Sequence, residues 1–346
     1  MQINKRKQFY SHIAFSLALL LILKSHAAAA GGDNRYCGPG NVPSFGASDG
    51  PASLPQSCFY TAMSATPSPN PPTTVPAGTL TQLNTAINNA KCGDTIELPA
   101  GAVYSGGNGG NLSLPPKNCD NQHWITIQSN ALASLPPEGT RISPCYSNVA
   151  SLPGRPAYNC PAGGPTPLMP TIILGSQGSV NITGDHYRLI GLEITQNVGQ
   201  LIFQLVTTAG SSQIIMDRLW IHGRPTDDTA HGVTLDDVNH VAIIDSYFSD
   251  IHCVNGAVCN DAQAISGGLD SLTPGFAGTY KIVNNFMEAS TENFIFGGGH
   301  SVDVPADFEI RRNHMFRPVI RNVGNLQTLS RVGGVVVAQS NVFNFT

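Results

Sequence analysis

Charged residues are scarce in this sequence. Only 12% of its 346 residues are Asp, Glu, Lys or Arg, whereas Gly and Pro contribute 36 and 25 residues. Helices of soluble proteins display charged side chains on their solvent-facing sides, so this composition excludes a mostly helical protein. A chain rich in Gly, Pro, Ser, Thr and Asn, with short β-branched runs, is typical of strands joined by many turns.

Long apolar runs are missing after the first 30 residues. Before that point, basic residues at 5–7 precede an apolar run over 13–23 and a series of alanines at 27–30. This order predicts a secretory signal peptide over residues 1–30. The apolar run is about half the roughly 20 residues that a membrane-spanning helix needs. We therefore predict a secreted protein, extracellular or periplasmic, with no membrane span after the signal is cleaved.

Basic residues are also few. The formal net charge is −4 at pH 7, and loss of the basic residues in the signal peptide would shift it to about −8. A nucleic-acid-binding protein needs a basic patch or stripe on its surface. We therefore expect no nucleic-acid partner.

Cysteine is present in an even number, and all eight cysteines follow the predicted signal peptide. In an exported chain this favours disulfides over metal-bound thiolates. Many connectivities are possible, and pairing of neighbours along the chain is the simplest. The predicted disulfides are Cys37–Cys58, Cys92–Cys119, Cys145–Cys160 and Cys253–Cys259.

The chain divides into three parts: the signal peptide, an N-terminal segment over 31–78, and a repeat region over 79–346. The segment 31–78 is rich in Pro, Ser and Gly, and predicts an irregular, disulfide-tied leader. Residues 80–90 carry apolar side chains at helical spacing. They predict a short helix, which would belong to one βα unit or would cap the end of a stacked core.

A repeat of about 28 residues runs through the second half of the chain. Its units at 213–220, 241–248, 280–287 and 308–315 each combine an apolar strand, two polar turn residues and a second apolar pair. One step is longer, and its extra residues fit the segment that holds Cys253 and Cys259. Stacked in this way, four isoleucines should share one core: Ile215, Ile243, Ile282 and Ile310.

The residue types decide between solenoid classes. Leucine-rich repeats would show recurrent Leu, and helical repeats would show amphipathic segments, and neither is present. Short Val/Ile strands with polar corners predict coils of three strands, and Asn285, Asn313 and Asn341 predict an internal ladder of side chains. The predicted fold is an all-β, right-handed parallel β-helix with a short N-terminal capping helix.

The sequence ends at Thr346, directly after a repeat strand. A solenoid that ended there would leave an uncapped coil exposed. We expect either a C-terminal truncation or an interface with another chain.

Several segments resemble the pectin-lyase-like superfamily of right-handed parallel β-helices, and in particular its pectate-lyase-like exported bacterial proteins. Ile244-Asp245-Ser246 partly matches an Ile-Asp-His segment of pectate lyases, and Asp261 matches the first carboxylate of an Asp-Gly-x-x-Asp segment. Arg317-Pro318 and Arg321 are one residue short of an Arg-x-Pro-x-x-Arg segment. The resemblance implies a secreted protein that binds and cleaves an acidic, pectin-like polysaccharide by calcium-assisted β-elimination.

The resemblance also implies a calcium site. Elimination removes the proton beside a sugar carboxylate, and Ca²⁺ disperses the charge that develops there. The implied ligands are Asp217, Asp245 and Asp261, of which the first two would lie one strand spacing apart, about 4.8 Å, if they occupy equivalent positions of adjacent coils. Corner aspartates also cap turns through backbone amides, so a purely structural role remains open.

Arginines cluster between residues 311 and 331 of an acidic protein, which suits the recognition of sugar carboxylates or sulfates. By resemblance, Arg317, Arg321 and Arg312 are the catalytic candidates, although an ordinary guanidinium stays protonated. Pairing with nearby Asp and Glu residues is the alternative role for these arginines. The substrate-binding candidates are Arg311, His314, Glu288, Glu292 and His300.

Two other functions remain open. A noncatalytic carbohydrate-binding or cell-surface rod fits the incomplete motifs. An inverting glycoside hydrolase would need two carboxyls about 6.5–9.5 Å apart, for which Asp227–Asp228 and Asp236–Asp237 are candidates. Convergence of Asp245, Asp261, Arg317 and Arg321 in one groove would favour the lyase over the rod.

Overall fold

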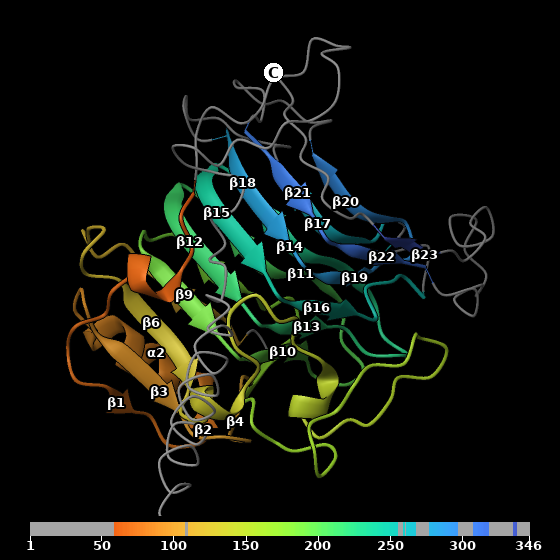
Figure 1. Ribbon diagram of the computed structural model, residues 1–346, viewed down its shortest axis with the longest axis horizontal. Coiled ribbons are helices and arrows are strands. Elements are labelled where there is room, and N and C mark those ends of the chain that lie inside the picture. The colour runs from red at the N-terminus through yellow and green to blue at the C-terminus, as the bar shows by residue number, and fades with distance from the viewer. Residues whose placement is uncertain are drawn as a thin grey trace, which may run out of the picture.

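The computed structural model describes residues 59–107, 110–254, 259, 261–267, 277–296, 307–317 and 335–337. They wind into coils of short strands, and successive coils add strands to the three parallel sheets in Figure 1. This is a right-handed parallel β-helix, so the predicted fold is confirmed. The right-handed sense is the one that parallel crossover connections adopt almost without exception.

The strands of each sheet follow chain order along the axis of the solenoid. Sheet A contains β1 Thr73–Thr74, β3 Thr95–Leu98, β6 Ile125–Ser129, β9 Tyr187–Ile190, β12 Ser211–Asp217, β15 Val238–Ile244, β18 Ala277–Val283 and β21 Glu309–Arg311. Sheet B contains β2 Gly78–Thr79, β4 Val103–Ser105, β7 Thr171–Leu174, β10 Glu193–Gln196, β13 Trp220–His222, β16 Tyr247–Ser249, β19 Phe286–Glu288, β22 His314–Phe316 and β23 Val335–Val337. Sheet C contains β5 Leu112–Leu114, β8 Val180–Ile182, β11 Ile202–Thr208, β14 Thr229–Leu235, β17 Gln263–Gly267 and β20 Glu292–Phe296. The pairings are parallel, except that β23 is antiparallel to β22.

The predicted helix is α2, Leu80–Asn89, and it covers the N-terminal end of the core. Thr79 and Gln82 form a capping box that satisfies backbone N–H groups of the first turn. Leu80, Leu83 and Ile87 are buried and belong to the main core, and the helix contacts β5, β2 and β4. The capping role is therefore confirmed. Among the described residues, three short 3₁₀ helices complete the regular elements: η1 Met63–Ala65, η2 Leu132–Ser134 and η3 Pro144–Tyr146.

The predicted repeat alignment is wrong by one residue between β12 and β15. Met216, and not Ile215, lies opposite Ile243, which continues to Ile282 and Ile310 in the main core. Ile215 faces the other side of sheet A, in a separate cluster with Trp124. The separation from Leu219 to Ser246 is 27 residues, whereas that from Asn285 to Asn313 is 28.

The predicted ladder of corner side chains is confirmed for Asn285 and Asn313. Asn285 Oδ1 accepts a hydrogen bond from the Ser246 N–H (2.9 Å), and Asn313 Oδ1 accepts one from the Asn285 N–H (2.9 Å). The Asn285 amide also donates to the carbonyl of Ile243 (2.8 Å). Asn341 lies outside the described residues.

Two segments cover the outer faces of sheets A and B. The strap formed by residues 59–66 lies on sheet A, where Arg188 and Lys281 bond to Thr61. The loop over 130–168, yellow-green in Figure 1, packs on sheet B through a second hydrophobic cluster that includes Ile142 and Trp220.

The disulfides Cys92–Cys119, Cys145–Cys160 and Cys253–Cys259 are confirmed, with Cα–Cα distances of 5.2, 5.3 and 5.2 Å. The predicted Cys37–Cys58 pair lies outside the described residues. Within the described part of the chain, no helix is long and apolar enough to cross a membrane.

Candidate functional site

A row of polar side chains crosses the strands of sheet C. The parallel register places Gln204, His231, Gln263 and Glu292 opposite one another in four successive coils, on β11, β14, β17 and β20. Adjacent strands are about 4.8 Å apart, so residues from distant parts of the sequence become neighbours along the axis of the solenoid. His231 and Glu292 are half-buried, and Gln263 is only 3% exposed.

Two carboxyl groups meet at the C-terminal end of this row. Gln263 Nε2 donates to Asp261 Oδ2 (2.7 Å) and to Glu292 Oε2 (3.4 Å). Asp261 is exposed and immediately precedes β17, where the chain enters sheet C. Gln263 Oε1 is buried and has no hydrogen-bond partner among the described residues. The amide therefore holds the two carboxyls together while its oxygen remains an unused acceptor.

The surroundings of Glu292 and His231 favour the neutral form of each side chain. Burial raises the pKa of Glu292, and the neighbouring Asp261 carboxyl raises it further, by its charge and as a hydrogen-bond partner. Burial lowers the pKa of His231, and the opposing effect of Asp261 is smaller. His231 Nδ1 is 3.2 Å from the Thr234 hydroxyl oxygen, which orients the ring.

The positively charged residue beside these side chains is Arg317. It follows β22 at the end of sheet B that leads towards sheet C, and it is half-buried. Its positive charge lowers the pKa of Glu292, opposing the effects of burial and of Asp261. We call His231, Asp261, Gln263, Glu292 and Arg317 the sheet C polar cluster.

This cluster combines three chemical capacities in one place. A neutral imidazole can accept a proton, a carboxyl with a raised pKa can hold or donate one, and a guanidinium can bind a carboxylate. Groups with shifted pKa values in opposite directions are typical of acid and base pairs in enzymes.

The predicted calcium ligands do not converge. The register pairs Asp217 with Ile244 and not with Asp245, because of the 27-residue step. Asp217 is fully buried and forms ion pairs with Arg188 (2.5 Å) and Arg218 (2.8 Å). Its carboxylate oxygens are therefore already bonded to two cations.

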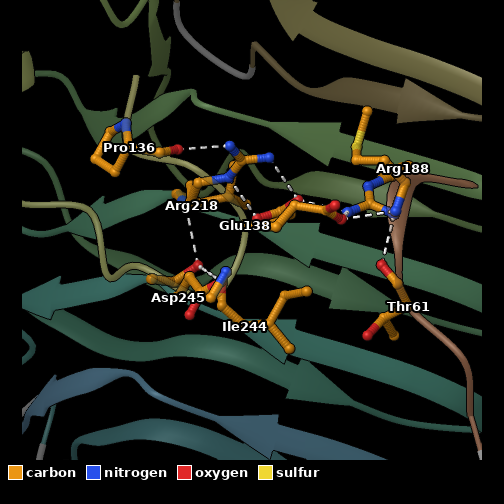
Figure 2. Close-up of polar contacts among 12 residues, drawn as sticks. Thr61, Pro136, Glu138, Arg188, Arg218, Ile244 and Asp245 are labelled. Atoms are coloured by element: carbon orange, nitrogen blue, oxygen red, sulfur yellow. Dashed lines mark hydrogen bonds and ion pairs between the residues drawn. The ribbon is translucent and has the colours of Figure 1, made fainter. Parts of the chain in front are cut away.

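Asp245 has a different set of partners. It accepts hydrogen bonds from the Gly139 N–H (2.7 Å) and from the Asn284 amide (2.6 Å). Figure 2 shows Asp245 beside Arg218, and Arg188 reaching towards Thr61 and Glu138. Asp261 immediately precedes β17 of sheet C, away from this corner of sheets A and B. Within the described residues, no group of three or more His, Cys, Asp or Glu side chains could hold a metal ion.

The predicted arginines are also distributed over different faces. Arg311 is fully buried on β21 and pairs with Glu309 (2.5 Å). Arg312 occupies the turn between sheets A and B, where its carbonyl accepts a bond from Arg141 (2.9 Å). Of the three catalytic candidates, Arg317 lies in the sheet C polar cluster, and Arg321 lies outside the described residues.

The predicted substrate-binding residues separate in the same way. Glu288 is buried and accepts two hydrogen bonds from Arg155, both 2.7 Å. His314 lines a cavity on sheet B. Glu292 belongs to the sheet C polar cluster, and His300 lies outside the described residues.

In the acidic pair Asp227–Asp228, proposed for a hydrolase, both carboxylates bond to backbone N–H groups of neighbouring coils. Asp227 accepts a bond from the Gly199 N–H (2.8 Å), and Asp228 accepts one from the Val254 N–H (2.6 Å). Asp237 has a positive φ of 47°, as turn residues often have.

Two members of the cluster, His231 and Gln263, are absent from the predicted site. Gln263 is uncharged, so its residue type alone does not indicate a catalytic or binding role. His231 is one of ten histidines and carries no motif. His231 and Gln263 both belong to short apolar strand segments, one coil apart. Because that coil differs in length from the regular repeat, an alignment of the sequence alone does not place the two residues opposite each other.

The comparisons with known proteins concern the fold. No protein-family profile matches the sequence, and no curated protein is significantly similar to it. The structure is similar to that of an alginate lyase from Paenibacillus sp., with a TM-score of 0.39 and 17% identity over 70% of this chain and 74% of the other. For the pectate lyase Pel9A, the TM-score is 0.36 and the identity 11%, over 71% and 64% of the two chains. For the PL6 family alginate lyase AlyGC, the values are 0.29 and 11%, over 70% and 31%.

Proposed function

We propose that the protein is a secreted polysaccharide lyase that cleaves an acidic polysaccharide at the sheet C polar cluster. The observation that carries the proposal is the convergence of Asp261, Glu292 and Arg317 beside His231, on one sheet of a solenoid. An extended chain of sugars can lie along such a face, because successive coils repeat at about 4.8 Å.

The reaction assigned to this cluster is β-elimination. His231, neutral because burial lowers its pKa, takes the proton from the carbon beside the sugar carboxylate. The released electron pair forms the new double bond as the glycosidic carbon–oxygen bond breaks. Glu292, which holds its proton more tightly than usual, donates that proton to the departing oxygen. Arg317 binds the sugar carboxylate and stabilises the charge that develops there.

Calcium dependence remains a prediction. The implied ligand set of Asp217, Asp245 and Asp261 does not fit, because Asp217 is bonded to two arginines and Asp261 lies beside sheet C, just before β17. No step of the reaction above is therefore assigned to a metal. A calcium requirement, if found, would point to the oxygens of Asp261, Glu292 and Gln263, since carboxylate and amide oxygens are what calcium binds.

The close contact of Asp261 and Glu292 disfavours a hydrolase. Inverting enzymes hold their carboxyls about 6.5–9.5 Å apart, and retaining enzymes about 5–5.5 Å. Asp261 and Glu292 are instead within hydrogen-bonding reach of each other, and both bond to Gln263. A noncatalytic rod would not need an acid, a base and a cation together.

The function is tested by offering the purified mature protein several polyuronates, including polygalacturonate and alginate. We expect ultraviolet-absorbing, unsaturated products from at least one of them, because elimination leaves a double bond conjugated to the carboxylate. Parallel reactions with a calcium chelator determine whether the metal is required. New reducing ends without ultraviolet absorbance would show hydrolysis, and binding without cleavage by the folded protein would show a rod; either result contradicts the proposal.

A further inference from the structure

A separate cavity of about 470 Å³ lies on sheet B. It lies between the loop over 136–161 and the strands β16, β19 and β22. The Cys145–Cys160 disulfide closes this loop on itself. Arg155 fixes the loop to the solenoid through its bonds with Glu288 on β19 and with Asp250 (2.9 Å).

One wall of the cavity is a continuous row of aromatic rings. Tyr247 stacks on Phe286 with ring centroids 4.3 Å apart, and Tyr158 meets Tyr247 edge-on at 5.8 Å. His314 meets the other side of Phe286 at 5.0 Å. The faces of Tyr247 and Phe286 cover each other, and each ring is only 3% exposed. The ring edges, together with the half-buried Tyr158 and His314, therefore form the apolar wall against which the C–H groups of a sugar can pack.

Arg141 places a positive charge in the same cavity. Its guanidinium donates to three oxygens of uncharged groups: the Asn284 carbonyl (2.8 Å), the Asn284 side chain (3.3 Å) and the Arg312 carbonyl (2.9 Å). None of the carboxylates in the described residues lies within ion-pair distance of Arg141. Burial lowers the pKa of Arg141 to about 10, an effect that the more distant Asp245 only partly offsets.

A partly buried cation without a paired anion is energetically costly. An anionic ligand would supply the missing charge, and Nη1 of Arg141, which donates none of these three bonds, can donate a charge-assisted hydrogen bond to a carboxylate. The polar side chains of Thr140, Ser143 and Asn159 also line the cavity. They suit a ligand with several hydroxyl groups better than a purely aromatic acid.

We propose that this cavity is a binding site for a single carboxylate-bearing sugar ring, a hexuronate, with its carboxylate on Arg141 and its ring against the aromatic wall. The cavity is on sheet B and the sheet C polar cluster is on another sheet, so this binding is independent of cleavage. It therefore goes beyond the proposed lyase activity and does not depend on it.

The test is calorimetric titration of the full mature protein with D-galacturonate, D-galactose and benzoate. The monosaccharide has no glycosidic bond, so cleavage cannot affect the result. We expect galacturonate to bind, and galactose and benzoate to bind at least tenfold more weakly, because only galacturonate has both the carboxylate and the hydroxyl groups. Equal binding of galactose or benzoate would overturn the proposal.

Matched variants locate the site. Arg141→Gln should weaken galacturonate binding at least tenfold, whereas Lys91→Gln, at an exposed lysine outside the cavity and outside the sheet C polar cluster, should leave it unchanged. Because Arg141 also bonds to two backbone carbonyls, Ala157→Trp provides a second test: it fills the cavity from an exposed position without altering the guanidinium. Binding that survives both cavity variants, or that is lost in Lys91→Gln, would contradict the assignment.

Discussion

At the scale of single residues, the buried charges of sheet A are structural. Asp217 pairs with Arg188 and Arg218, and Lys281 bonds to Thr61 beneath the strap over 59–66. Buried ion pairs contribute little over a well-packed apolar alternative, but breaking one leaves an uncompensated charge. These aspartate and arginine residues therefore hold the strap and the corner in place, and the chemistry is assigned to another sheet.

Replacing Asp217 with Asn tests this structural role. The change leaves Arg188 and Arg218 without their shared counter-charge, and we expect the free energy of unfolding to fall by about 3–5 kcal/mol. Urea denaturation at pH 7 measures the change. Asp120→Asn is the control, because Asp120 is exposed and should change stability by less than about 0.5 kcal/mol.

The pH dependence of the Asp217→Asn variant gives a second check on the same prediction. Burial would raise the pKa of Asp217, but Arg218 and Arg188 outweigh it and hold that pKa below its usual value. A depressed carboxyl pKa adds stability above the unfolded-state pKa, about 3.9. The difference in stability between the unmodified protein and the Asp217→Asn variant should therefore persist down to about pH 4 and shrink below it. A constant difference over this range would contradict the ion-pair account.

At the scale of elements, the ladder at the turn between sheets A and B joins the coils. The Asn285 side chain is fully buried and bonds to Ser246, Ile243 and Asn313. Its amide therefore serves three coils at once. The same two-residue turn sets the register of the strands that follow it in sheet B. As a result, the aromatic residues of β13, β16 and β19 lie in one row on the outer face of that sheet.

Substituting Asn285 with Ala should destabilise the fold by about 3 kcal/mol, because it leaves the buried Ser246 N–H and the Ile243 carbonyl without partners. Thermal or urea unfolding provides the measurement. Asn88→Ala on the exposed side of α2 is the matched control and should be neutral or slightly stabilising, since Ala has the higher helix propensity. Equal changes in stability for the two substitutions would show that the buried ladder contributes no more to stability than an exposed asparagine.

At the scale of the whole molecule, the sequence is enough to predict the class of fold and three of the disulfides. The repeat of apolar strands and polar corners is visible without structure, because each coil uses the same tight turn. The alignment fails at Ile214, Ile215 and Met216, where all three residues are apolar and no alternation marks the inward face. The physical reason is that the strap over 59–66 buries the outer face of sheet A as well.

The site could be predicted only in part. Asp261, Glu292 and Arg317 are identifiable by their charge near partial motifs, and the structure brings these three together. Asp217 and Asp245 are not register partners, because a one-residue change in coil length alters which residues are neighbours. His231 and Gln263 belong to the site because the strand register places them side by side. That register cannot be predicted from the sequence, because the connections between sheets B and C vary in length.

The most direct test of the account is the rate at which His231→Gln releases unsaturated product from the polyuronate that the unmodified protein cleaves. We expect a fall of at least about 100-fold, the typical contribution of a general base, with unchanged unfolding behaviour. His123→Gln, at an exposed histidine next to Asp120, is the control and should retain the full rate. A folded His231→Gln protein that retains the full rate would contradict the assignment of catalysis to the sheet C polar cluster.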